Sequence, residues 1–183
     1  MNAPRMIRYL PLAAMICFAA SAAAQGTPAY TPPPKPQPQA PAVEKNLKMF
    51  DMLDFDVFSN QKWDRFPESH ANDIVVTWPD GHETHGLAVH IEDLKAMFAY
   101  APDTRIAVHP IRFGSGDWTS VTGVMTGTFS KPMAIGGGKF IQPTGKSFKL
   151  GMATIGHWKN GKMDHEWLYW DNATYVSQLG IGK

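Results

Sequence analysis

Residues 148–171 read FKLGMATIGHWKNGKMDHEWLYWD, two apolar runs joined by a short polar turn. Asn160-Gly161 is a dipeptide typical of two-residue hairpin turns, and the runs on either side are rich in β-branched and aromatic residues. The stretch therefore predicts two long antiparallel strands, in which Trp158 pairs with Met163 across the turn.

One face of the second predicted strand combines aromatic rings with titratable groups. Side chains alternate between the two faces of a strand, so this face carries every second residue. Its members are His165, Trp167, Tyr169 and Asp171. Such a set is unusual for a solvated surface, and we interpret this face as the wall of a pocket. The opposite face would then point outward, and it carries Glu166, Leu168 and Trp170.

The chain before this hairpin predicts three helical segments and further strands. Apolar residues recur at helical spacing in residues 47–57, 63–66 and 87–98. Strands are expected at residues 74–78, 104–113 and 118–130. Helices followed by strands exclude an alternating parallel α/β fold and indicate an α+β fold, with helices packed on one face of an antiparallel sheet. Glycines within the strands allow the sheet to bend strongly enough to enclose a cavity.

The first residues have the pattern of a secretory signal peptide. Arg5 and Arg8 precede an apolar stretch, and Ala22-Ala23-Ala24 provides the small residues of a cleavage site. The chain then divides into a signal peptide (1–24), a Pro-rich linker (25–42) and one domain (43–183). We expect a periplasmic or secreted protein with no stable membrane insertion after the signal peptide is removed.

Composition excludes several classes of function. The formal net charge is +1, and loss of the two signal-peptide arginines makes it slightly negative. The charges are interspersed along the chain, so the sequence predicts no basic patch for nucleic acid. Cys17 is the single cysteine and leaves with the signal peptide, so the mature chain has neither a disulfide nor a thiol nucleophile.

Several short motifs are arranged as in a known family. They are Pro79-Asp80-Gly81, Met125-Thr126-Gly127-Thr128, Pro143-Thr144-Gly145-Lys146, Asn160-Gly161-Lys162 and Gln178-Leu179-Gly180. Together with the order of helices and strands, they resemble the SnoaL-like polyketide cyclases, also called ester cyclases, of the nuclear-transport-factor-2-like superfamily. The resemblance covers essentially everything after the linker.

The resemblance implies a cone-shaped α+β fold, in which a curved antiparallel sheet packs against the N-terminal helices and encloses an apolar pocket. It also implies an aspartate that acts as general acid/base in an intramolecular aldol closure without metal or organic cofactor, and Asp171 matches that aspartate. Neighbouring aromatic rings would desolvate Asp171 and raise its pKa. The alternative is that Asp171 caps the closing helix, which would lower its pKa.

Four further residues are expected to bind the substrate. His165, Trp167 and Tyr169 share the face of Asp171 on the second strand of the hairpin. His157 lies at the end of the first strand, where the predicted pairing places it opposite Asp164. Either imidazole could orient the substrate or relay a proton.

A histidine cluster invites a metal interpretation, which we reject from the sequence. His82, His85 and His90 form the densest group of potential ligands. Their spacing does not match the His-Glu-x-x-His motif of metalloproteases, and two of them precede Gly86 instead of sharing a helical face. We therefore expect solvated histidines and no metal.

These observations predict an exported protein that binds a small, largely apolar carbonyl compound. Asp171 would move a proton in a cyclisation or isomerisation. The alternative is a non-catalytic periplasmic ligand-binding or scaffold module on the same fold, which a capping Asp171 would favour. The outer face of the sheet, with Trp170 as an anchor, could support a homodimer.

Overall fold

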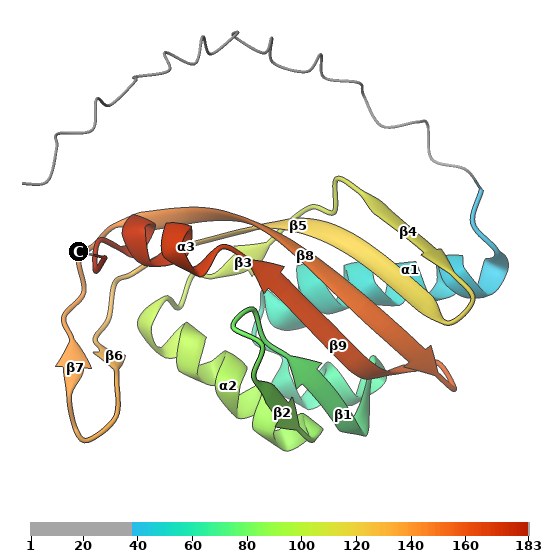
Figure 1. Cartoon of the computed structure of the whole chain (residues 1–183), viewed down its shortest axis with the longest axis horizontal. Coiled ribbons are helices and arrows are strands. Elements are labelled where there is room, and N and C mark those ends of the chain that lie inside the picture. The colour runs from blue at the N-terminus through green and yellow to red at the C-terminus, as the bar shows by residue number, and fades with distance from the viewer. Residues whose placement is uncertain (1–37, 183) are drawn as a thin grey trace, which may run out of the picture. The chain divides into compact units, whose positions relative to one another are not determined.

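The computed structural model describes residues 38–182 (Figure 1). The predicted signal peptide and most of the predicted linker lie outside these residues. Helix α1 (Pro41–Met52) begins just before the predicted start of the domain at residue 43. Within the described part of the chain, no helix is long and apolar enough to cross a membrane.

The predicted helical segments are present, with one unexpected geometry. The helices after α1 are η1 (Leu53–Phe58), η2 (Trp63–Glu68), α2 (Leu87–Tyr100) and α3 (Asn172–Leu179). Element η1 continues α1 as a π-helix, a wider turn that is often found at functional sites. Gly86 precedes α2 with a φ of 93°, a backbone conformation that glycine adopts without strain.

Seven strands in residues 38–182 form the main sheet, in the order β2-β1-β9-β8-β5-β3, with β4 also paired to β5. They are β1 (His70–Thr77), β2 (Glu83–His85), β3 (Arg105–Ile106), β4 (Arg112–Ser115), β5 (Trp118–Thr128), β8 (Ser147–Lys159) and β9 (Lys162–Trp170). A separate hairpin contains β6 (Met133–Ala134) and β7 (Phe140–Ile141).

Two details of the predicted sheet were wrong. The strand predicted at residues 104–113 is divided into β3 and β4, and Pro110 lies between them, where it cannot donate a ladder hydrogen bond. The sheet is not wholly antiparallel, because β1 pairs with β9 in parallel. Helix α2, which follows β1 and β2, packs against β1, the neighbour of β9 in the sheet.

The hairpin of β8 and β9 forms as predicted. Trp158 pairs with Met163, and the turn residues Asn160 and Gly161 have φ values of 53° and 76°. These positive angles are the ones required by the tight turns that suit twisted hairpins. The register shifts after His157, which pairs with His165 instead of Asp164.

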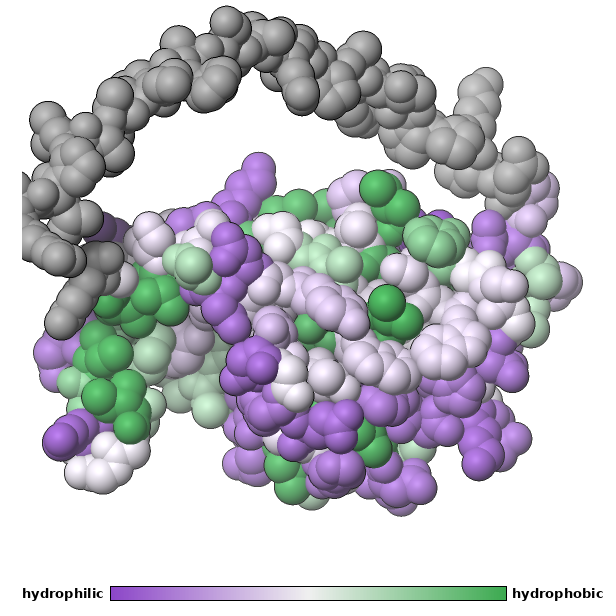
Figure 2. Space-filling model, in the orientation of Figure 1, coloured by the Kyte–Doolittle hydropathy of each residue, from purple (hydrophilic) through white to green (hydrophobic). Residues whose placement is uncertain are grey.

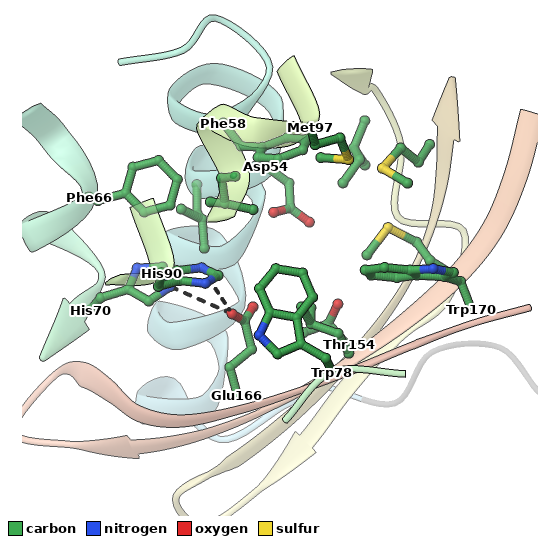
Figure 3. Close-up of a pocket in the computed structure, with 16 residues that line it drawn as sticks. Asp54, Phe58, Phe66, His70, Trp78, His90, Met97, Thr154, Glu166 and Trp170 are labelled. Atoms are coloured by element: carbon green, nitrogen blue, oxygen red, sulfur yellow. Dashed lines mark ion pairs between the residues drawn. The ribbon is translucent and has the colours of Figure 1, made fainter. Parts of the chain in front are cut away.

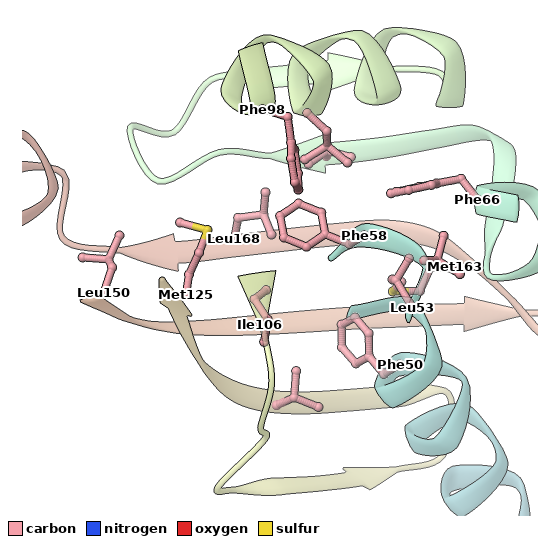
Figure 4. Packing of buried hydrophobic residues seen from close by; sticks show 14 of the residues in the cluster. Phe50, Leu53, Phe58, Phe66, Phe98, Ile106, Met125, Leu150, Met163 and Leu168 are labelled. Atoms are coloured by element: carbon pink, nitrogen blue, oxygen red, sulfur yellow. The ribbon is translucent and has the colours of Figure 1, made fainter. Parts of the chain in front are cut away.

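The helices cover one face of the curved sheet (Figure 1). Phe50 and Phe58, from the first helical segments, are buried with Phe98 of α2, and the rings of Phe58 and Phe98 meet edge to face at 5.1 Å (Figure 4). The sheet contributes Met125 and Leu168 to the same core. The predicted α+β architecture, a curved sheet packed against helices, is confirmed.

Apolar surface gathers at the β6–β7 hairpin (Figure 2). Ile135 and Phe140 in this segment are 56% and 55% exposed. The hairpin belongs to the glycine-rich excursion between β5 and β8, and it extends away from the core described above.

Candidate functional site

A small cavity of about 50 Å³ lies between the helices and the sheet (Figure 3). Its walls are mostly apolar, and they are formed by Leu53, Asp54, Phe58, Phe66, His70, Trp78, His90, Leu94, Met97, Ile106, Met125, Met152, Thr154, Glu166, Leu168 and Trp170. Four of these side chains are only half-buried and mark the side nearest solvent: Trp78, Met97, Met152 and Trp170. This volume can hold a few water molecules or a group of a few carbon atoms. A larger ligand fits only if the flexible methionine side chains in the wall move aside.

The alternation predicted for β9 is correct, but the face assigned to the pocket was wrong. Glu166, Leu168 and Trp170 point into the cavity, whereas the predicted pocket face points away from it. Tyr169 is 50% exposed. Because β9 carries aromatic rings on both faces, its sequence alone does not show which face is buried. Neighbouring residues lie on opposite faces, so choosing the wrong alternate set assigns the pocket to the wrong face.

The four residues predicted to bind the substrate therefore lie outside the cavity. His165 stacks on Trp167 at 3.7 Å between ring centroids, and Trp167 lies 5.4 Å from Trp118 of β5. His157 also contacts Trp118, at 4.7 Å, and its Nδ1 is 2.5 Å from Asp164 Oδ1. His157, His165 and Trp167 thus pack around Trp118 on the face of the sheet opposite the cavity, whereas Tyr169 borders a surface depression.

Asp171 takes the capping position that the sequence left open. Its side chain accepts hydrogen bonds from the backbone N–H groups of Ala173 and Thr174, at 2.9 and 3.2 Å, and from the Thr174 hydroxyl. The hydroxyl and the two N–H groups hold the pKa of Asp171 below its usual value. Asp171 is exposed and borders a surface depression, so the structure does not place it in the internal cavity.

A pH-dependent stability test follows from this cap. Asp171→Ala is expected to lower the thermal midpoint of the full chain at neutral pH, because two N–H groups of α3 lose their acceptor. The folded pKa lies below the unfolded value of about 3.9, so this stabilisation is present above about pH 4 and is lost as the pH falls through the folded pKa. Calorimetry at several pH values measures it. Asp171→Asn is the matched control, which keeps a capping oxygen without the titration; an unchanged midpoint in Asp171→Ala would contradict the cap.

Three buried polar side chains meet at one wall of the cavity (Figure 3). His70 begins β1, His90 lies in the first turns of α2, and Glu166 lies in the middle of β9. Glu166 Oε2 is 3.8 Å from His70 Nε2 and 3.5 Å from His90 Nε2. Of the histidine cluster predicted to be solvated, His82 and His85 are exposed, but His90 is buried in the cavity wall.

Burial shifts the proton affinities of this group. It lowers the pKa of His90 to about 4, so that imidazole is neutral at physiological pH. Burial also raises the pKa of Glu166, but the imidazoles of His70 and His90 lower it by more, and the net pKa of Glu166 is below its usual value. Glu166 is therefore held as a carboxylate inside an apolar cavity.

A second polar group enters the cavity from the π-helix. Asp54 is buried, and its Oδ2 is 2.8 Å from His109 Nε2. The other ring nitrogen of His109 is 2.8 Å from Asp51 Oδ1, and Arg112 donates to the second oxygen of Asp51 at 2.9 Å. Asp51 and Arg112 are partly exposed. A continuous chain of hydrogen bonds thus leads from the cavity toward the surface.

The carboxyl and imidazole of this chain hold a proton between them. Burial raises the pKa of Asp54, and the hydrogen bond with His109 offsets this only in part. Burial alone would lower the pKa of His109, but its hydrogen bonds and charge interactions with Asp54 and Asp51 raise it by more. Of the two cavity carboxyls, Asp54 is therefore the one whose pKa is raised, the direction that a general acid/base needs.

Sequence reasoning missed Asp54, His70, His109 and Glu166 as site residues. Asp54 carried a local signal, because it is a charged residue within the apolar stretch Leu53–Phe58. The other three carried none, since each becomes notable only through a partner distant in sequence. His109, for example, joins residues 58 and 55 positions away along the chain.

Comparison with known proteins identifies the family. Residues 50–179 match the family model described as SnoaL-like polyketide cyclase. The chain belongs to this family. No protein with a curated function matches this SnoaL-like chain significantly.

Solved structures share the fold of this SnoaL-like chain at low sequence identity. A candidate SnoaL-like polyketide cyclase from Jannaschia sp. CCS1 aligns with a TM-score of 0.70 and 16% identity, over 81% of this chain and 100% of its own. IdmH from Streptomyces antibioticus, a candidate polyketide cyclase, aligns with a TM-score of 0.62 and 21% identity, over 74% and 99%. AclR from Streptomyces galilaeus, a candidate hydroxylase, aligns at 0.61 and 17%, over 75% and 96%. At these identities the likeness concerns the fold alone.

Proposed function

We propose that this SnoaL-like chain binds a small, largely apolar carbonyl compound in its cavity, and that Asp54 moves a proton during a cyclisation or isomerisation. The observation that carries the proposal is the buried Asp54 carboxyl, which lines the cavity and is hydrogen-bonded through His109 to the partly exposed Asp51. Family membership supports a cyclase or isomerase type of reaction. The Asp171 role implied by the resemblance is not part of this proposal.

The proposed reaction begins with proton removal from carbon. The Asp54 carboxylate takes a proton from the carbon next to the carbonyl, which leaves an enolate. In a cyclisation, the enolate carbon forms a C–C bond to a second carbonyl of the same molecule, and Asp54 returns the proton to the resulting alkoxide. In an isomerisation, Asp54 returns the proton to a different carbon. Both routes conserve all atoms and electrons. Both also need a general base whose pKa is raised toward the pH at which it works.

The chain of hydrogen bonds from Asp54 through His109 to Asp51 would let Asp54 gain or lose a proton between the steps of the reaction. His109 is held between Asp54 and Asp51 by hydrogen bonds of 2.8 Å each. This fixes the ring so that a proton can move between Asp54 and the imidazole without side-chain rotation. Asp51 stabilises the positive charge of the ring when the proton rests there, as a carboxylate does for an imidazolium in other catalytic dyads.

Hydrogen–deuterium exchange at carbon tests the proposal directly. Small ketones and 1,3-dicarbonyl compounds are incubated with the full chain in deuterated water, and proton NMR follows the loss of signal next to the carbonyl. We expect the wild type to accelerate the exchange and Asp54→Asn to lose the acceleration. Equal rates with and without wild-type protein, across compounds that bind, would contradict the proposal.

A non-catalytic binding module remains the second candidate, and one observation favours it. Asp171 caps α3, which removes from the cavity the aspartate that the resemblance implied as the acid/base. The same NMR samples distinguish the two functions, because a binding module would shift the resonances of a bound ketone without exchanging its protons.

Export is a separate proposal that rests on the N-terminal sequence. Arg5, Arg8 and the Ala22-Ala23-Ala24 site support a signal peptide that is removed before Gln25. Expression of the full gene in a Gram-negative host, followed by mass spectrometry of the periplasmic and secreted fractions, is expected to yield a chain that begins at Gln25. A full-length chain confined to the cytoplasm would contradict export.

A further inference from the structure

We propose that His70, His90 and Glu166 form a binding site for one divalent transition-metal ion, with zinc and iron(II) as the best-suited metals. One ligand atom from each residue lies within 4.8 Å of the other two. The nitrogen–oxygen separations are 3.8 Å for His70 and 3.5 Å for His90, both measured to Glu166 Oε2 (Figure 3). Metal bonds of about 2.0–2.2 Å place tetrahedral ligands roughly 3.4 Å apart, so small side-chain movements complete the site.

The present contacts leave two of these three ligand atoms without hydrogen-bond partners. His70 Nε2 and Glu166 Oε2 are buried and have no hydrogen-bond partner among residues 38–182. Their separation of 3.8 Å is too long for a hydrogen bond. Buried polar atoms without partners are costly and rare in folded proteins. A cation at the centre of the group would satisfy both atoms and His90 Nε2 together.

Ser69 orients His70 for this role. The Ser69 hydroxyl is fully buried; it donates to the Phe66 carbonyl at 3.3 Å and lies 2.8 Å from His70 Nδ1. The 2.8 Å contact fixes the His70 ring, and when Nε2 binds a metal ion the Ser69 hydroxyl can accept the Nδ1–H of His70. The opposite nitrogen, Nε2, faces Glu166 Oε2 at 3.8 Å. A ring nitrogen and a carboxylate oxygen that face each other across a buried space can both bind one metal ion, and the Ser69 contact holds the imidazole in the orientation that this needs.

The donor set defines the class of metal. Two imidazole nitrogens and one carboxylate oxygen are the protein ligands of many catalytic zinc sites and of non-haem iron(II) sites, which keep further positions open. Here the three ligands come from β1, α2 and β9, and the open positions would face the apolar cavity. A carbonyl oxygen bound there would be polarised by the metal. This departs from the metal-free site that the resemblance implied.

The metal proposal does not depend on the role of Asp54. Asp54 belongs to η1 and is hydrogen-bonded to His109, whereas none of the three ligands belongs to that helix or that chain of hydrogen bonds. Metal binding is measured by spectroscopy and exchange at carbon by NMR, so either proposal can fail while the other stands.

Cobalt(II) titration of the chelator-treated full chain tests the site. We expect visible d–d absorption that saturates at one equivalent of cobalt(II), and the band should disappear when zinc is added. Glu166→Gln should abolish the band, and Ser69→Ala should weaken cobalt(II) affinity by about 10–100-fold, because it removes a partner that orients a ligand. His82→Asn and His85→Asn are matched controls at exposed histidines, and both should bind as the wild type does.

Two outcomes would overturn the proposal. The first is a folded wild-type chain, verified by circular dichroism, that shows no saturable cobalt(II) band. The second is a band that persists in Glu166→Gln or that disappears in the His82→Asn and His85→Asn controls. If Glu166→Gln does not fold, His90→Gln replaces it, and the wild-type titration alone still decides whether a stoichiometric site exists.

Discussion

Asp54→Asn is expected to slow carbonyl-dependent proton exchange by about 10²–10⁴-fold, the usual contribution of a positioned general acid/base. Asparagine keeps the size of the side chain and can still hydrogen-bond His109, but it cannot accept a proton from carbon. The effect should fall on kcat, since the cavity retains its shape. NMR exchange rates at saturating ketone, measured for both chains, give the ratio.

Asp64→Asn is the matched control for this substitution. Asp64 is exposed and lies in η2, so the same change of charge occurs away from the cavity. Its exchange rate should equal that of the wild type. An Asp54→Asn chain that retains more than half of the wild-type rate would remove Asp54 from the mechanism and leave the binding module as the better account.

Phe50→Ala is expected to lower the free energy of unfolding by about 3–5 kcal/mol, because it removes a large ring from a closely packed core. Phe50 is 0% exposed and joins α1 to the sheet. Its ring centroid lies 6.0 Å from Trp158 of β8 and 6.0 Å from His109. Urea denaturation of the full chain, followed by tryptophan fluorescence, measures the loss.

Phe140→Ala provides the comparison for Phe50→Ala. Phe140 is 55% exposed in the β6–β7 hairpin, and exposed substitutions of this kind usually change stability by no more than about 0.5 kcal/mol. A loss of under 1 kcal/mol in Phe50→Ala would show that α1 is not held to the sheet by this contact. Phe50→Ala should also loosen the packing around the His109 ring. The rate of carbonyl-dependent proton exchange should therefore fall in this variant.

Local patterns were sufficient for most of the fold. Asn160-Gly161 and the apolar runs beside it predicted the β8–β9 hairpin and the pairing of Trp158 with Met163, because turn chemistry and strand propensity act between neighbours in sequence. Helical spacing likewise located α1 and α2, and the short motifs identified the family. The division of residues 104–113 into β3 and β4 was missed, although Pro110 marked it.

The site was decided by tertiary structure. The sequence determined that Glu166 and Tyr169 lie on opposite faces of one strand, because alternation is a local property of the backbone. The face that points inward was decided by the packing of α2 and η1. These helices bury His90 and Asp54 beside the face of β9 that carries Glu166, and this face is therefore the cavity wall. Titratable groups from three distant segments change one another's pKa values only when packing brings them together and removes the water between them. No spacing in the sequence shows which segments will meet in this way.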